Sequence, residues 1–163
     1  RLRLQSKLQA EVARVTLHGH DCLLARPVTV MNPSGQAVRA VMDYYAAGAE
    51  SVLVAYDELD LPPGVARLKQ GGGHGGHNGL RDIFRHTADH NFLRLRIGIG
   101  HPGTRDAVTG YVLSRANAEQ ERLIFSALDR ALAVLPDLLD GDLADAMKEL
   151  HTMNEDGIGT NGV

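Results

Sequence analysis

The chain has 163 residues, of which 44% are hydrophobic and 23% charged, with a net charge of −3. This length and composition are those of one globular domain with a sizeable core, so we expect a single domain over residues 1–163. The absence of a long apolar stretch argues against secretion and membrane insertion, and the lone Cys22 cannot form an internal disulfide. We therefore expect a cytoplasmic protein, and the net negative charge argues against nucleic-acid binding through overall charge.

The charged side chains are segregated along the chain. Residues 64–105 contain seven basic and two acidic side chains, whereas residues 116–163 contain three basic and ten acidic ones. The basic side chains of the first segment are Arg67, Lys69, Arg81, Arg85, Arg94, Arg96 and Arg105. Two interpretations of this segment stay open, contact with phosphates and a set of solvated faces.

The first fifty residues predict a hairpin followed by a helix. Residues 11–17 alternate apolar and polar side chains, and an apolar run over 22–25 follows the turn-like segment 18–21, which is the pattern of a β-hairpin. Two prolines then keep the chain extended before Ser34, which we expect to cap a helix that continues to about Ala47. Met31 and Asn32 would lie in the strand-to-helix connection.

The middle of the chain predicts alternating strands and helices. Residues 51–56 form a continuous apolar run typical of a central strand, and the acidic segment DELDLPPG follows from Asp57. We expect further strands over 65–69 and 92–99, a loop over 71–77 and a helix over 78–86. This order predicts an α/β fold with a mixed twisted sheet flanked by helices.

The last third of the chain predicts helices. Asn117 and Gln120 have the spacing of a capping box. The apolar stripe of the following helix consists of Leu123, Ile124, Ala127, Leu128, Ala131, Leu132 and Leu135. A second, short helix is expected over 143–150, and the polar, glycine-rich tail from about Asn154 is expected to be frayed.

The segment GGGHGGHNGL, from Gly71 to Leu80, has six glycines among its first nine residues. Such a run indicates either that another group lies close to the backbone or that the residues have positive φ, although a plain flexible turn is the alternative. Asn78 could cap the helix that starts there or bind a peptide or carbonyl group with its amide. His74 and His77 lack convincing further ligands, so we predict no metal site.

Three carboxylates lie within four positions after the apolar run. An exposed acidic turn explains Glu58 and Asp60, whereas Asp57 is placed to be partly buried and to orient a histidine that acts as a general base. Together with the amides of Asn32 and Asn78, Asp57 suggests hydrolysis of a polar ester or amide. No serine or cysteine nucleophile stands out.

Several motifs of this chain resemble those of the bacterial-type peptidyl-tRNA hydrolases. They are RPVTVMNPSG at 26–35, DELDLPPG at 57–64, RLKQGGGHGGHNGLRDI at 67–83, FLRLRIGIGHP at 92–102 and YVL from 111. The resemblance implies an enzyme that cleaves the ester between a peptide and the 3′ ribose of tRNA and so recycles tRNA during translation. It implies peptidyl-tRNA as the partner, no metal or organic cofactor, no membrane, no stable protein partner and a monomer.

The resemblance also implies roles for individual residues. Asn32 and Asn78 correspond to the substrate-binding asparagines, and Asp57 to the carboxylate that holds the catalytic histidine. Met31, Val30 and His77 would line the site. Lys69, Arg96 and Arg105 correspond to basic residues that contact the tRNA backbone.

The chain departs from the family pattern in two places. The family carries its general-base histidine in an early motif of the form G-x-x-N-P-G-x-x-Y-x-x-T-R-H-N, and no segment of this chain matches it. We therefore expect an N-terminally incomplete chain without the family's first strand and following helix, inactive by itself. Val30 stands where the family usually has an aromatic residue, which weakens the expected stacking on the terminal nucleotide.

Two other functions compete with the hydrolase. A non-catalytic RNA-binding relative would bind RNA in a salt-dependent way without turnover, but it has no chemical need for Asn32, Asp57 and Asn78 together. An amidase or esterase for small molecules would act regardless of the tRNA portion, and the basic segment counts against it.

Overall fold

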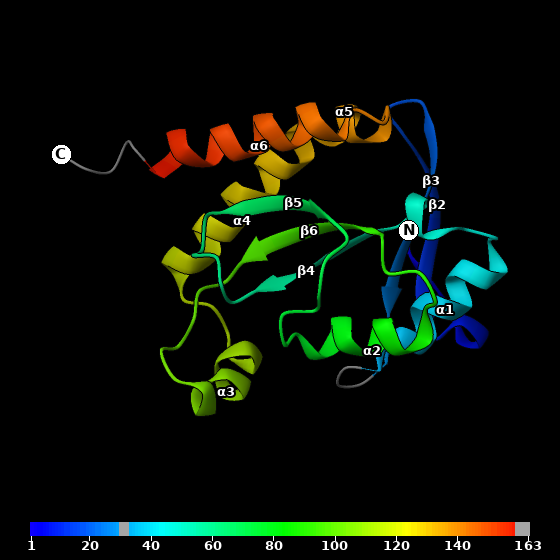
Figure 1. The fold of residues 1–163 in the computed structure, drawn as a ribbon, viewed down its shortest axis with the longest axis horizontal. Coiled ribbons are helices and arrows are strands. Elements are labelled where there is room, and N and C mark those ends of the chain that lie inside the picture. Colours follow the sequence, from blue (N-terminus) through cyan, green and yellow to red (C-terminus); the bar gives the residue numbers. More distant parts are fainter. Residues whose placement is uncertain (30–32, 159–163) are drawn as a thin grey trace. The chain divides into compact units, whose positions relative to one another are not determined.

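The computed structural model describes residues 1–29 and 33–158, and these form two compact units (Figure 1). Unit 1 comprises Arg1–Leu53 and Gln70–Leu93, and unit 2 comprises Val54–Lys69 and Arg94–Val163. The prediction of a single domain over 1–163 stays a prediction, and each unit is described by itself below.

Unit 1 contains a three-stranded antiparallel sheet in the order β1-β2-β3. Its strands are β1 (Arg3–Gln5), β2 (Ala10–Leu17) and β3 (His20–Pro27), with a short 3-10 helix over Ser6–Leu8. The predicted hairpin is confirmed, but its turn is shorter than expected. Leu17 pairs with His20, so the turn consists of His18 and Gly19, which both have positive φ, as tight hairpin turns require.

Helix α1 (Ser34–Tyr44) packs on this sheet. Ala40, Val41 and Tyr45 contact the buried cluster of Leu8, Ala10 and Val12. The prediction that Ser34 caps this helix is wrong, because Pro33 is the N-cap residue and Ser34 is the first helical residue. The helix also ends at Tyr44 and not near Ala47, and a 3-10 helix over Ala49–Ser51 leads to the next strand.

Unit 2 is built on a mixed sheet in the order β4-β6-β5. The strands are β4 (Leu53–Glu58), β5 (Ala66–Gln70) and β6 (Leu93–Gly98), whose outermost residues Leu53, Gln70 and Leu93 are grouped with unit 1. Leu93 N donates to Val52 O and Ile99 N donates to Glu58 O, both at 3.0 Å, and the constant offset between the paired residues shows that β4 and β6 are parallel. Gly98 N donates to Val65 O at 2.9 Å and Gly71 N donates to Phe92 O at 3.1 Å, so β5 and β6 run in opposite directions, as the arrows in Figure 1 show.

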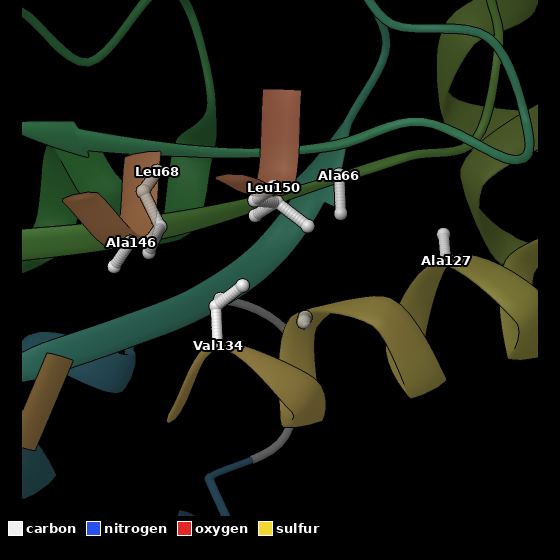
Figure 2. Close-up of a cluster of buried hydrophobic side chains, with 7 residues drawn as sticks. Ala66, Leu68, Ala127, Val134, Ala146 and Leu150 are labelled. Atoms are coloured by element: carbon white, nitrogen blue, oxygen red, sulfur yellow. The ribbon is translucent and has the colours of Figure 1, made fainter. Parts of the chain in front are cut away.

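Helices α4 (Ala118–Ala133), α5 (Leu135–Leu139) and α6 (Leu143–Ile158) contribute to the apolar cluster that covers one face of this sheet. A 3-10 helix over Arg105–Ala107 and the short helix α3 (Val108–Leu113) precede them, and α3 has no buried residue. Side chains from β5, α4, α6 and the residue after α4 form a buried cluster (Figure 2), which consists of Ala66, Leu68, Ala127, Ala131, Val134, Ala146 and Leu150. Burial of each leucine or valine side chain in this cluster adds about 1.5–3 kcal/mol to the free energy of unfolding.

The sequence predicted the start of α4 correctly and part of its buried face wrongly. The capping box is present, because Asn117 Oδ1 accepts from Gln120 N and Gln120 Oε1 accepts from Asn117 N. Ala127 and Ala131 are buried as expected. Leu132, which was assigned to the same stripe, is 62% exposed.

A frayed tail was expected from about Asn154. The structure differs from this expectation as far as Ile158, and residues 159–163 lie outside the described residues. Helix α6 continues to Ile158, and Asn154 is 4% exposed. Its side-chain amide binds the backbone of β5 on both sides, since Oδ1 accepts from Ala66 N at 3.4 Å and Nδ2 donates to Ala66 O at 2.6 Å. A polar residue near the C-terminus is thereby buried without an unpaired group.

The α/β fold class is confirmed, with two three-stranded sheets where one was expected. Cys22 is half-buried in β3. Within residues 1–29 and 33–158, no helix has the length and apolar character needed to span a membrane.

Replacing Asn154 with alanine is expected to destabilise the protein by about 1–3 kcal/mol, because Ala66 N and Ala66 O lose their side-chain partner in a buried place. Urea unfolding measures this loss. The matched control is Thr152→Ala, which removes an exposed side chain one half-turn earlier on α6 and is expected to change stability by less than about 0.5 kcal/mol. Equal effects of the two substitutions would contradict the role of Asn154.

Candidate functional site

The glycine loop of unit 1 connects β5 to α2 (Asn78–His86), as predicted (Figure 1). Gly71, Gly72, Gly75 and Gly76 all have positive φ, which non-glycine residues rarely adopt. Apart from the adjacent residues of the chain, no described atom lies within 4 Å of the position that a Cβ would take at Gly75 or Gly76. The glycines of this loop therefore meet a conformational requirement, and the space beside Gly75 and Gly76 is open.

The start of α2 differs from the prediction in an informative way. His77 is the N-cap residue, and its Nδ1 accepts a hydrogen bond from Leu80 N at 3.1 Å. Asn78 is the first helical residue. The Asn78 side chain is exposed, and it does not serve as the cap of α2.

In unit 2, Asp57 lies near the C-terminal end of β4 and is half-buried, as expected for a carboxylate that orients another group. Glu58 was expected in an exposed turn. It is instead the last residue of β4, and its Oε1 lies 3.3 Å from Arg96 Nη2 of β6, with both side chains largely buried. Because side chains alternate along a strand, Asp57 lies on the opposite face of β4 from this ion pair.

A second arginine of β6 is also internal. Arg94 is 1% exposed and donates a hydrogen bond to the Tyr56 hydroxyl of β4. Burial raises the pKa of the Tyr56 hydroxyl above its ordinary value, while the bond from Arg94 opposes this shift. Arg94 therefore serves the interior of unit 2, and it does not contribute to the basic surface that the charge pattern suggested.

The basic side chains that are exposed in unit 2 include those at two positions of β5. Arg67 and Lys69 alternate with the buried Ala66 and Leu68, so they share the face of β5 that points away from the apolar cluster. Arg105 is exposed at the start of the 3-10 helix that precedes α3. Exposed basic groups of this kind can meet phosphates.

Three of the predicted substrate residues, Val30, Met31 and Asn32, lie outside the described residues. Among the others, His77 and Asn78 belong to unit 1, whereas Asp57, Lys69, Arg96 and Arg105 belong to unit 2. The structure brings Asn78 next to the capping His77, and within unit 2 it places Arg96 against Glu58.

The eight histidines of the chain have identifiable structural surroundings. Six of them hydrogen-bond a backbone group through a ring nitrogen, namely His74, His77, His86, His90, His101 and His151. His18 lies in the hairpin turn. His20, which was expected in the same turn, is the first residue of β3 and pairs with Leu17.

Sequence reasoning missed one polar contact near the predicted site residues. The carboxylate of Asp82 on α2 accepts a hydrogen bond from Gly35 N at the start of α1. A signal for it was present, because the Pro33 side chain has no oxygen to cap α1 and Asp82 follows Asn78 by one helical turn.

Comparisons with known proteins agree with one another. The family model for peptidyl-tRNA hydrolase matches residues 1–157. The chain is 56% identical to the peptidyl-tRNA hydrolase of Pseudomonas putida over 142 residues, which are 86% of this chain and 73% of the relative. It is 47% identical to that of Legionella pneumophila over 149 residues, which are 91% of this chain and 79% of the relative.

A solved structure supports the same assignment. The crystal structure of peptidyl-tRNA hydrolase from Acinetobacter baumannii matches with a TM-score of 0.88 and 46% identity, covering 92% of this chain and 76% of that one. A match over nearly the whole chain at this identity shows a common family as well as a common fold. The chain belongs to the peptidyl-tRNA hydrolase family.

Proposed function

We propose that the chain binds peptidyl-tRNA for hydrolysis of the ester that joins the peptide to the 3′ ribose. This reaction returns tRNA to translation. The family match over residues 1–157 supports this function. The observation that supports a specific site is the position of Asn78. It is the exposed first residue of α2, and the capping hydrogen bond of this helix is made by His77.

In the proposed reaction, water attacks the ester carbonyl carbon and gives one proton to a general base. The carbonyl oxygen becomes an oxyanion, and the Asn78 amide is placed to donate a hydrogen bond to it. Collapse of the tetrahedral intermediate breaks the bond to the ribose 3′ oxygen, which takes up the proton. The products are the peptide carboxylate and tRNA with a 3′ hydroxyl.

The remaining residues have proposed supporting roles. Asp57 would orient the basic histidine, and Asn32 would hold the peptide. Met31, Val30 and His77 would line the substrate. Lys69, Arg96 and Arg105 would contact the tRNA backbone, with Arg96 also held by Glu58.

We further propose that the general base is not among residues 1–163, so that these residues alone hydrolyse the ester slowly. Two observations support this. No segment matches the T-R-H-N motif, and the rings of His74, His77, His101 and His151 each use a nitrogen lone pair to accept a hydrogen bond from a backbone N–H of their own unit.

The test of the proposed function compares two proteins on N-acetyl-aminoacyl-tRNA. One is the 163-residue chain, and the other is the same chain with the T-R-H-N segment of a family member joined before Arg1. Release of tRNA is expected to be about 10²–10⁴ times faster in the second protein, the usual contribution of a general base. Salt-dependent tRNA binding without turnover in both would contradict the proposal and favour a binding relative.

Replacing Lys69 with alanine is expected to weaken tRNA binding and to reduce the slope of log affinity against log salt by about 0.7–0.9, because one phosphate contact is lost. Fluorescence anisotropy with labelled tRNA at several salt concentrations measures both quantities. Lys148→Ala, which removes an exposed lysine from the acidic α6, is the control and should leave the slope unchanged. An unchanged slope for Lys69→Ala would remove Lys69 from the proposed tRNA surface.

The assembly and location of the protein follow from the same proposal. Peptidyl-tRNA arises at the ribosome, so we propose that the protein acts in the cytoplasm. We also propose that it acts as a monomer.

A further inference from the structure

Helix α1 lacks a capping side chain of its own. Its N-cap residue is Pro33, whose ring offers no hydrogen-bond acceptor, and the first turn of the helix contains no acidic residue. The first four N–H groups of a helix have no partner inside it, and the helix dipole favours a negative charge near them. The start of α1 therefore needs an acceptor from elsewhere in the chain.

Asp82 of α2 supplies this acceptor within unit 1. Gly35 N donates to Asp82 Oδ2 at 2.7 Å, across 47 residues of sequence. The Asp82 side chain is only 18% exposed, so the charge-assisted bond is partly shielded from water. His86, one turn further along α2, bonds the Asp82 carbonyl oxygen through Nδ1 at 2.8 Å.

The same contact requires glycine at position 35. A Cβ at Gly35 would lie 2.2 Å from Asp82 O and 2.5 Å from His86 Nδ1. No side chain fits there unless α1 and α2 move apart. Two independent features of the chain thus keep the first turn of α1 against α2. The Asp82 carboxylate bonds it, and the lack of a Cβ at Gly35 lets the two helices come this close.

Asn78 lies on the side of α2 where this contact is made. Residues four apart on a helix share a face, and Asp82 follows Asn78 by four. We infer that Asp82 is a positioning residue for the reaction, because it holds the start of α1 against the face of α2 that carries Asn78. The inference rests on the proposed function, since it assigns Asp82 to the handling of the same substrate.

Asp82→Ala is the first test, and it uses the 163-residue chain with a small probe. The probe is an N-acetyl-aminoacyl adenosine whose ester is replaced by an amide, so that it is not hydrolysed. Calorimetry is expected to show about tenfold weaker binding, the size of effect expected when one hydrogen bond to the probe is lost. Hydrogen exchange of the Gly35 amide should become faster in the same variant.

Two further variants separate positioning from general stability. Asp82→Asn keeps an oxygen that accepts from Gly35 N and should restore binding to within about threefold of the original chain. Gly35→Ala should weaken binding at least as much as Asp82→Ala, because its Cβ forces α1 and α2 apart, and the double variant should lose little beyond Gly35→Ala alone.

The matched control is Asp89→Ala. Asp89 accepts a backbone hydrogen bond from Asn91 N at 2.8 Å, so the substitution removes a bond of the same kind in the same unit, after the end of α2. Probe binding should stay unchanged in this variant. Wild-type binding by Asp82→Ala, or an unchanged exchange rate of the Gly35 amide, would overturn the inference. Failure of the unsubstituted chain to bind the probe would instead overturn the proposed function and the positioning role with it.

Discussion

Strand β6 lies between β4 and β5, so both of its edges are hydrogen-bonded. Its side chains point alternately to an apolar face and a polar face of the sheet. On one face Leu95 packs against the apolar cluster under α4 and α6. On the other face Arg94 and Arg96 meet Tyr56 and Glu58 of β4. Burying two arginines is tolerable only because each meets a polar partner, and these pairings align β4, the strand that carries Asp57.

Helix starts are the second constraint on the candidate site. At α2 the cap is His77, and the next residue, Asn78, is exposed and does not cap the helix. At α1 the cap position holds Pro33, and the acceptor comes from Asp82 of another helix. The N–H groups at the start of α2 are thus capped by the neighbouring residue, whereas those at the start of α1 depend on a carboxylate from a distant part of the sequence.

Local patterns predicted much of this structure. The hairpin, the order of strands and helices after it, the loop over 71–77 and the capping box at Asn117 each depend on neighbouring residues, and each is confirmed. The errors concern distant contacts. Asn154 is ordered because it binds β5, and the first turn of α1, where Ser34 was expected to cap, receives its acceptor from Asp82 of α2. For the same reason the basic residues of 64–105 could be counted but not divided into exposed ones and internal ones such as Arg94.

The central claim is that residues 1–163 carry substrate recognition by a hydrolase and not a general affinity for RNA. The most direct measurement compares the affinity of this chain for N-acetyl-aminoacyl-tRNA with its affinity for the same tRNA without the acyl group, at one salt concentration. The account predicts tighter binding of the acylated tRNA by about tenfold, and it predicts that Asn78→Ala removes this difference. Equal affinities of the unsubstituted chain for the two tRNAs would contradict it.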